Sequence, residues 1–253
     1  MGMTIHSRDL ENVPRPVVAL ADEYPANFVD PRHHHARAQL LYAASGVMSV
    51  VTDSASFVVP PQRAIWMPAG VDHEVTCRSA VSIRTLYVDA ANDTRRECRV
   101  IEVSDLLRAL ILEAMVLPRE YDRTGREGRI VQLILDSIDA PGAPSLSVPM
   151  PREPRLAAIC REFIAEPARS DSLDDLAARA CMSRRTFTRL FRDQTGMSLA
   201  EWRQHVRLLE AMARLSRGQP VTTTAYDVGY ESPSAFTAAF QRAFGVPPSR
   251  YVH

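Results

Sequence analysis

Residues 176–191 read LAARACMSRRTFTRLF, and residues 225–240 repeat the same pattern as AYDVGYESPSAFTAAF. A constant offset of 49 positions relates four pairs of residues: Phe187 and Phe236, Phe191 and Phe240, Gly196 and Gly245, and Trp202 and Tyr251. Before the serines at 183 and 232 the offset falls to 48, so the second turn is one residue longer. Each copy predicts a short helix, a tight turn, an N-cap serine and a second helix, which is a helix-turn-helix. Two such units in one chain indicate DNA binding.

The distribution of charge agrees with a DNA-binding half. The whole chain has a net charge of zero, but residues 1–151 contain 15 arginines and 19 acidic residues, a formal charge of −4. Residues 152–253 contain 15 arginines and 11 acidic residues, a formal charge of +4. A basic half joined to a neutral or acidic one is the expected footprint of a DNA-binding domain with a partner domain.

Targeting signals are missing from the sequence. The first ten residues, MGMTIHSRDL, lack the apolar stretch of a signal peptide. No segment reaches the roughly 18 uncharged apolar residues of a membrane-spanning helix. We therefore expect a cytoplasmic protein with no membrane partner.

The N-terminal part predicts β structure. Short runs rich in β-branched and aromatic residues alternate with Gly, Pro, Asp and Ser, as in a sandwich or barrel. The predicted strands are Val17–Leu20, Gln39–Tyr42, Val47–Thr52, Phe57–Val59, Ala64–Met67, Glu74–Cys77 and Val81–Val88.

From residue 101 the apolar period becomes helical. Ser104 can cap a helix whose apolar stripe is Leu106, Leu107, Leu110, Ile111 and Ala114. A second helix is predicted over Arg126–Ser137, with Ile130, Leu133, Ile134 and Ile138 as its stripe. Two such helices must cover the β domain or pair with another subunit, and we expect them to form a homodimer.

Five prolines in residues 141–154, PGAPSLSVPMPREP, mark a semi-stiff linker. We therefore divide the chain into a sensor domain (1–100), a helical dimerisation or cover region (101–140), a linker (141–153) and a DNA-binding domain (154–253). The last domain is predicted to be all helical, which makes the whole chain α+β. Its expected helices are Pro154–Glu166, Leu173–Ala180, Ser183–Gln194, Ser198–Arg217, Val221–Val228 and Ser232–Phe244.

The helix after Ser183 carries the strongest DNA-reading pattern. Phe187, Leu190 and Phe191 lie at i, i+3 and i+4 and must face the core. The opposite stripe then holds Arg185, Thr188 and Arg189, with Arg184 and Arg192 at its margins. Arginine reads guanine in the major groove, threonine contacts a thymine methyl, and flanking arginines neutralise phosphates.

The helix after Ser232 is a weaker candidate. Its outward residues are Ser234, Thr237, Ala238 and Gln241, with Arg242 at the edge. With a single charge, it is expected to contribute shape, methyl and backbone contacts, so the first helix should dominate specificity. A joining helix of about 20 residues spans about 30 Å, which can place both helices in successive major grooves.

Residues 154–253 resemble the DNA-binding domain of the AraC/XylS family of transcription regulators. The matching segments are LAARACMSRRTFTRLF, GMSLAEW and AYDVGYESPSAFTAAFQRAFGVPPSRY. The resemblance implies base contacts from Arg185, Thr188 and Arg189 and, in the second copy, from Ser234 and Ala238. Members of the family often carry a basic or amide side chain where Ala238 stands.

The histidine pattern of the N-terminal half resembles that of a second family, the cupins, and this resemblance implies a cupin-like β-barrel for the N-terminal domain. His33-x-His35-x₃-Gln39-x₆-Gly46, followed by Pro68-x-Gly70-x₂-His73, is similar to the two cupin motifs. The resemblance implies a divalent metal held by His33, His35, His73 and the residue at position 39, where cupins have a carboxylate and this chain has Gln39. Three imidazoles and an amide oxygen suit Ni, Zn, Co, Mn or Fe(II). The alternative is an organic effector bound without metal. His34 should point outward.

Two functions remain open at this point. The first is a transcription regulator that binds a DNA operator and responds to a small molecule or a metal through its N-terminal domain. The segments QLLYAASGVMSV and PQRAIWMPAGVDHEV resemble regulators of neighbouring efflux or detoxification genes. The alternative is a metal-dependent cupin enzyme, a dioxygenase or isomerase, with an appended DNA-binding domain. Apart from Glu74, the sequence places no acidic or basic residue close to the histidines that could act as a general acid or base. We therefore assign no catalytic residue and expect that the protein is not an enzyme.

Overall fold

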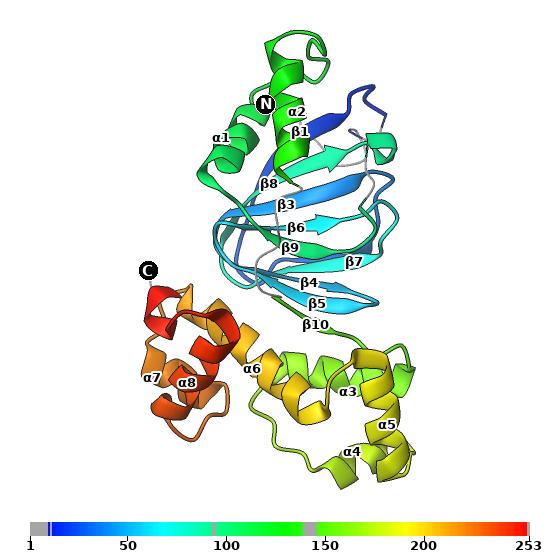
Figure 1. Ribbon diagram of the computed structural model, residues 1–253, viewed down its shortest axis with the longest axis vertical. Helices are drawn as coiled ribbons and strands as arrows, with labels where there is room; N and C mark the ends of the chain where they lie inside the picture. Colours follow the sequence, from blue (N-terminus) through cyan, green and yellow to red (C-terminus); the bar gives the residue numbers. More distant parts are fainter. Residues whose placement is uncertain (1–9, 11, 93–94, 139–145, 252–253) are drawn as a thin grey trace. The chain divides into compact units, whose positions relative to one another are not determined.

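The computed structural model describes residues 10, 12–92, 95–138 and 146–251, and it divides into two compact units (Figure 1). The first unit comprises residues up to Val50 together with Val59–Ser145. The second comprises Val51–Val58 and the chain from Leu146 onward. The first unit is rich in strands and the second in helices, which confirms the predicted α+β class.

The strands form two antiparallel sheets. The first has the order β1–β8–β3–β6–β9. Its strands are β1 (Val17–Tyr24), β8 (Val81–Val88), β3 (Ala38–Ser45), β6 (Arg63–Met67) and β9 (Arg99–Glu102). Along β3, residues 38, 40 and 42 lie in the hydrophobic core, whereas Gln39 and Leu41 line a cavity on the other face. The period of two therefore gives this sheet one core face and one cavity face.

The second sheet has the order β10–β5–β4–β7–β2. Its strands are β10 (Ser147–Pro149), β5 (Ala55–Val59), β4 (Met48–Thr52), β7 (His73–Cys77) and β2 (Val29–His33). Among the described residues the edge strands β1, β9 and β2 pair on one side alone. A closed barrel requires every edge to be paired, so the predicted barrel is instead a pair of separate sheets.

The sequence analysis did not predict three of the strands. β2 has the sequence VDPRH, whose proline and charges hide its strand character. β9 begins before residue 101, where we had placed the start of the helical region. β10 lies inside the predicted linker and pairs with β5, Ser147 opposite Phe57. The rest of the linker up to residue 145 is outside the described residues.

Helices α1 (Asp105–Ala114) and α2 (Arg126–Ser137) cover the core face of the first sheet (Figure 1). The Ser104 hydroxyl caps α1 by accepting a hydrogen bond from the Leu107 backbone N–H, and α2 has the predicted bounds. The predicted apolar stripes were wrong at two positions, because Leu106 is 59% exposed and Leu133 is 48% exposed. Leu106 and Leu133 lie beyond the edge of the face that meets the sheet.

The helices of the second unit match the predicted ones to within two residues. They are α3 (Pro154–Ala165), α4 (Leu173–Arg179), α5 (Arg184–Thr195), α6 (Leu199–Leu215), α7 (Val221–Asp227) and α8 (Pro233–Phe244), followed by a 3₁₀ turn η3 (Pro248–Tyr251). The boundaries follow from capping, since the hydroxyls of Ser183 and Ser232 each accept a backbone N–H three residues on. Gly196 and Gly245 end α5 and α8 in the left-handed conformation, at φ 72° and 75°.

The duplication seen in the sequence recurs in the packing of the rings. Phe191 meets Trp202 edge-on with ring centroids 6.0 Å apart. Forty-nine residues later, Phe240 meets Tyr251 edge-on at 5.6 Å. Each helix-turn-helix therefore has its own aromatic core, and α6 connects the two (Figure 1).

Candidate functional site

A cavity of about 510 Å³ lies within the N-terminal unit. Its wall takes residues from both sheets: Leu20, Asp22, Glu23, Tyr24, Phe28, Asp30, His33, His35, Gln39, Leu41, His73, Val75, Cys77, Ile83, Thr85 and Tyr87. All four residues of the predicted metal site are in this set. Two other aromatic residues of the first sheet, Trp66 and Tyr42, are buried in the core beneath α1 and α2 and do not line the cavity. Tyr87 does line the cavity.

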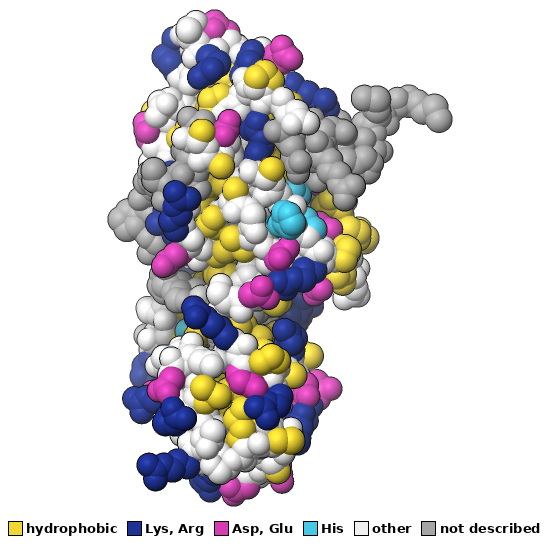
Figure 2. All heavy atoms as spheres, turned by 90° about the vertical axis from the view of Figure 1, so that its right-hand side faces the viewer, with side chains coloured by type: hydrophobic (Ala, Val, Ile, Leu, Met, Phe, Trp, Pro, Cys, Tyr) yellow, Lys and Arg dark blue, Asp and Glu magenta, His cyan; other side chains and the backbone are white. Residues whose placement is uncertain are grey.

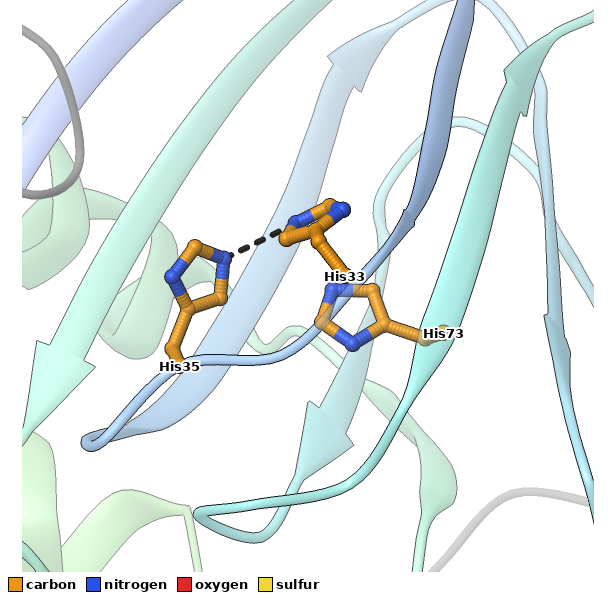
Figure 3. Close-up of side chains that lie close together, drawn as sticks. All are labelled: His33, His35 and His73. Carbon is orange, nitrogen blue, oxygen red and sulfur yellow. Dashed lines mark hydrogen bonds between the residues drawn. The ribbon is translucent and has the colours of Figure 1, made fainter.

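Three histidines converge at one place in the cavity wall (Figure 3). His33 comes from β2, His35 from the segment before β3, and His73 from the start of β7. Each offers one ring nitrogen within 4.8 Å of the others. Metal–nitrogen bonds of about 2.0–2.1 Å require donor nitrogens about 3.0–3.4 Å apart, and the nearest pair, His33 Nε2 and His35 Nε2, is 3.0 Å apart.

Backbone carbonyls fix the orientation of two of the rings. His33 Nδ1 lies 2.7 Å from the carbonyl oxygen of Pro31, and His73 Nδ1 lies 2.8 Å from that of Val71. A carbonyl oxygen can only accept, so both rings must be protonated at Nδ1, and in a neutral ring Nε2 then carries the lone pair. A second hydrogen bond of this kind is the usual support of a metal-binding histidine.

The environment keeps the inner histidines neutral. Burial, with help from the neighbouring His33, lowers the pKa of His35 to about 4. Burial likewise lowers the pKa of His73 below its ordinary value. Neutral imidazole is the form that binds metal, and His33 Nε2 already lies 3.0 Å from His35 Nε2. The arrangement is thus suited to hold a cation between the rings.

Gln39 contributes a buried acceptor without a partner. Its side chain is 4% exposed, and Oε1 makes no hydrogen bond with the described protein atoms. An unpaired buried acceptor is costly, so a ligand, an ion or water in the cavity would satisfy it. The donor set of three imidazoles and one amide oxygen fits a divalent transition metal.

The cluster is open to solvent at His33, whose side chain is 27% exposed. Histidine side chains also lie on the surface of the face drawn in Figure 2. His33 is partly exposed, whereas His35 and His73 are buried. His34 points away, as predicted: its side chain is 63% exposed, and its Nδ1 lies 3.1 Å from the Asp72 carboxylate.

The DNA-reading residues predicted on α5 share its outer surface. Phe187 and Phe191 are buried, and the five outward residues, Arg184, Arg185, Thr188, Arg189 and Arg192, are all exposed. Arg184 pairs with Asp174 and Arg189 with Asp193, each at 3.3 Å. Exposed pairs of this kind contribute about 0–1 kcal/mol, so they can readily be exchanged for phosphate or base contacts.

The outer surface of α8 is nearly uncharged. Ser234, Ala238, Gln241 and Arg242 are exposed and Thr237 is partly buried, whereas Phe236, Ala239 and Phe240 are buried. Four of the five predicted outward residues are therefore exposed, and Thr237 is the exception.

Arg207 of α6 connects the loop before α4 to the turn of the second helix-turn-helix. Its guanidinium donates to the carbonyl of Pro167, after α3, and to the carbonyl of Gly229, in the turn between α7 and α8. Gly229 has a φ of +87°, and a Cβ there would lie 3.2 Å from the Arg207 guanidinium carbon. The longer second turn, between α7 and α8, therefore packs directly against α6. Nothing in the sequence pattern pointed to this contact.

Two protein-family models match separate parts of the chain. The family model described as "AraC-like ligand binding domain" matches residues 15–138. The model described as "Helix-turn-helix domain" matches residues 176–253. The chain belongs to the AraC family of transcription regulators, with an effector-type N-terminal domain and a DNA-binding C-terminal domain.

Curated relatives are regulators as well. The HTH-type transcriptional regulator NimR of Escherichia coli K12 is 28% identical over 223 residues, which is 88% of this chain and 82% of NimR. The RCS-specific HTH-type transcriptional activator RclR of the same organism is 38% identical over 99 residues, 39% of this chain and 35% of RclR.

Two solved structures are similar to all or part of this chain. ToxT from Vibrio cholerae is 10% identical, covers 94% of this chain and 98% of its own, and gives a TM-score of 0.39. The DNA-binding domain of AdpA in complex with a target DNA is 34% identical, covers 38% of this chain and 86% of its own, and gives a TM-score of 0.36. Among the described residues no helix is both long and apolar enough to cross a membrane.

Proposed function

We propose that this regulator binds a divalent transition metal in its N-terminal cavity and that metal occupancy changes its affinity for a DNA operator. The convergence of three imidazole nitrogens within 4.8 Å in a cavity wall carries the proposal. His33, His35 and His73 would hold the ion, with Gln39 Oε1 as a neutral oxygen donor. Imidazole and amide donors suit Ni, Co, Zn, Mn or Fe(II).

A cavity of about 510 Å³ is far larger than one ion. Its volume falls within the range typical of small-molecule sites, and Tyr24 and Phe28 stack in its wall with ring centroids 4.4 Å apart. A small organic effector is therefore the second candidate, binding beside the metal or in its place.

On the DNA side, α5 would lie in the major groove. Arg185 and Arg189 would donate to guanine, Thr188 would contact a thymine methyl, and Arg184 and Arg192 would neutralise phosphates. The outer residues of α8, which are Ser234, Thr237, Ala238, Gln241 and Arg242, would meet the next major groove with weaker readout. This role assigns the protein to the cytoplasm, where its operator is.

Metal and DNA would be coupled through a shift in population. An effector that binds one arrangement of the molecule more tightly than another changes the DNA affinity by the difference in its two binding free energies. We also propose that two copies associate through α1 and α2, where Leu106, Leu112 and Leu133 remain exposed. A dimer would bring two DNA-binding domains to one operator.

The test combines metal analysis with selection of bound DNA. Purified wild-type protein, loaded with Ni²⁺, Co²⁺ or Zn²⁺ and desalted, should retain about one ion per chain, and H33A/H73A should retain none. Selection from random duplexes should yield one preferred sequence, which we expect upstream of its own gene or of a neighbouring efflux or detoxification gene. Retention of metal without any sequence preference, combined with turnover of a small substrate, would instead favour the cupin enzyme.

A further inference from the structure

The proposed metal site has a deficit of negative charge. Three neutral imidazoles and the Gln39 amide bring no charge to offset a divalent cation. A buried cation is stabilised by a charged partner, and the position where the cupin motif has a carboxylate holds an amide in this chain. A carboxylate from elsewhere in the fold would complete the site.

Asp30 is the carboxylate that lies against the histidines. It lines the same cavity, and its Oδ2 is 3.6 Å from His33 Nε2. The same nitrogen lies 3.0 Å from His35 Nε2. Both distances are near the spacing of about 3.0–3.4 Å between donor atoms on one ion. Glu23, which also lines the cavity, is engaged by Ser82 and Arg84 instead.

An irregularity in β2 explains why Asp30 faces the cavity. In a regular strand, residues 30 and 33 would point to opposite faces because their separation is odd. The pairing of β2 with β7 shifts register between Asp30 and His33. Such a bulge inserts an extra residue and re-aims the side chains that follow. Both Asp30 and His33 consequently line the cavity.

The residue inside this irregularity supports the site too. Pro31 has no N–H, so it removes a ladder hydrogen bond, and proline in sheets is found at edges and bulges. β2 is an edge strand. The Pro31 carbonyl accepts the hydrogen bond from His33 Nδ1 that leaves Nε2 free for a metal. One short segment, Asp30-Pro31-Arg32-His33, thus positions a carboxylate and an oriented imidazole together.

We propose that Asp30 is a metal ligand and supplies the carboxylate that the cupin motif would place at position 39. The site would then consist of His33, His35, His73 and Asp30, with Gln39 as an additional neutral oxygen. The assignment rests on the proposed metal-binding function, and the experiment below separates the failure of one from the failure of the other.

Asp72 provides a matched control. Its side chain is 48% exposed against 47% for Asp30, and it too is paired with a histidine of the 33–35 run, at 3.1 Å from His34 Nδ1. Asp72 is not among the residues that line the cavity. D30N and D72N therefore remove the same charge at similar exposure, one inside the proposed site and one beside it.

The experiment is a Co²⁺ titration of the full chain, followed by visible absorption and by competition with a chromophoric chelator. We expect D30N to weaken Co²⁺ binding at least tenfold and to change the energy and intensity of the ligand-field bands. D72N should bind within twofold of wild type with an unchanged spectrum, and D30E, which keeps a carboxylate, should recover most of the affinity.

Other outcomes would overturn the assignment. If D30N binds like wild type, or binds more weakly with an unchanged spectrum, Asp30 is not a ligand. If wild type itself takes up no Co²⁺, the proposed metal-binding function fails and this assignment fails with it. Circular dichroism checks that D30N folds. If D30N does not fold, X-ray absorption of zinc-loaded wild type tests the assignment instead. A zinc coordination shell without a carboxylate oxygen would contradict it.

Discussion

The Thr188 hydroxyl is already occupied within α5. It donates to the Arg184 carbonyl at 2.9 Å, so the group left for a base is the methyl. We therefore expect T188V to keep the sequence preference of wild type within about threefold. T188S, which loses the methyl, should lose preference for thymine at one position, by about 1 kcal/mol or more. Binding titrations against operators altered base by base would measure this, and equal losses in both variants would contradict methyl readout.

Arg189 is the strongest candidate for guanine recognition. Its exposed ion pair with Asp193 costs little to break. R189A should weaken operator binding by about 1–3 kcal/mol and relax the preference at one base pair. R161A, which removes an exposed arginine from α3, is the control and should leave the base preference intact. An R189A protein with wild-type affinity and preference would rule out this role.

Side-chain periodicity made much of the site predictable. The outward set on α5 and the inward phenylalanines follow from helical spacing alone, and the resemblance to the cupin motifs identified three histidines that the fold brings together. Asp30 could not be found in this way, because a register shift between β2 and β7 puts it on the same face as His33 despite their odd separation. Leu133 was misplaced because periodicity indicates the centre of an apolar face better than its edges.

Arg207 of α6 holds two loops against α6, the one between α3 and α4 and the one between α7 and α8. This side chain donates to carbonyls on both sides of α6, those of Pro167 and Gly229. R207A should leave both carbonyls without their donor, lower the melting temperature by several degrees and weaken DNA binding without changing base preference. R207K should not restore the loss, since an ammonium lacks the planar fork of a guanidinium. R161A again serves as the control. Unchanged stability in R207A would contradict this role of Arg207.

The helices were more predictable than the strands for a physical reason. Helix ends are set locally by capping serines, prolines and glycines, and these residues are visible in the sequence. Strands depend on partners far away in the chain, as when β10 pairs with β5 about 90 residues earlier. Whether the two sheets close into a barrel depends on the pairing of all their edge strands. A short strand in a proline-rich segment, such as β10, therefore cannot be told from a linker by its sequence alone.

Exposed leucines on α1 and α2 form the proposed dimer interface. If two copies pair there, wild type should have twice the chain mass of 28.2 kDa in light scattering. L106E/L133E should then shift to the monomer mass, because a buried charge opposes association. V29E changes an apolar residue on β2 that is 47% exposed, close to the 48% of Leu133, and should remain dimeric. A wild-type monomer, or a dimer indifferent to L106E/L133E, would contradict this interface.

One titration tests whether the histidine cluster is coupled to the DNA-binding helices. The affinity of the full chain for its selected operator is measured with and without saturating Ni²⁺, Co²⁺ or Zn²⁺, for wild type and for H33A/H73A. A coupling free energy of about 1–3 kcal/mol corresponds to a change of about 5–150-fold, and we expect it in wild type with at least one metal and not in the variant. Identical wild-type affinities in the presence and absence of every metal would show that the histidines do not control DNA binding.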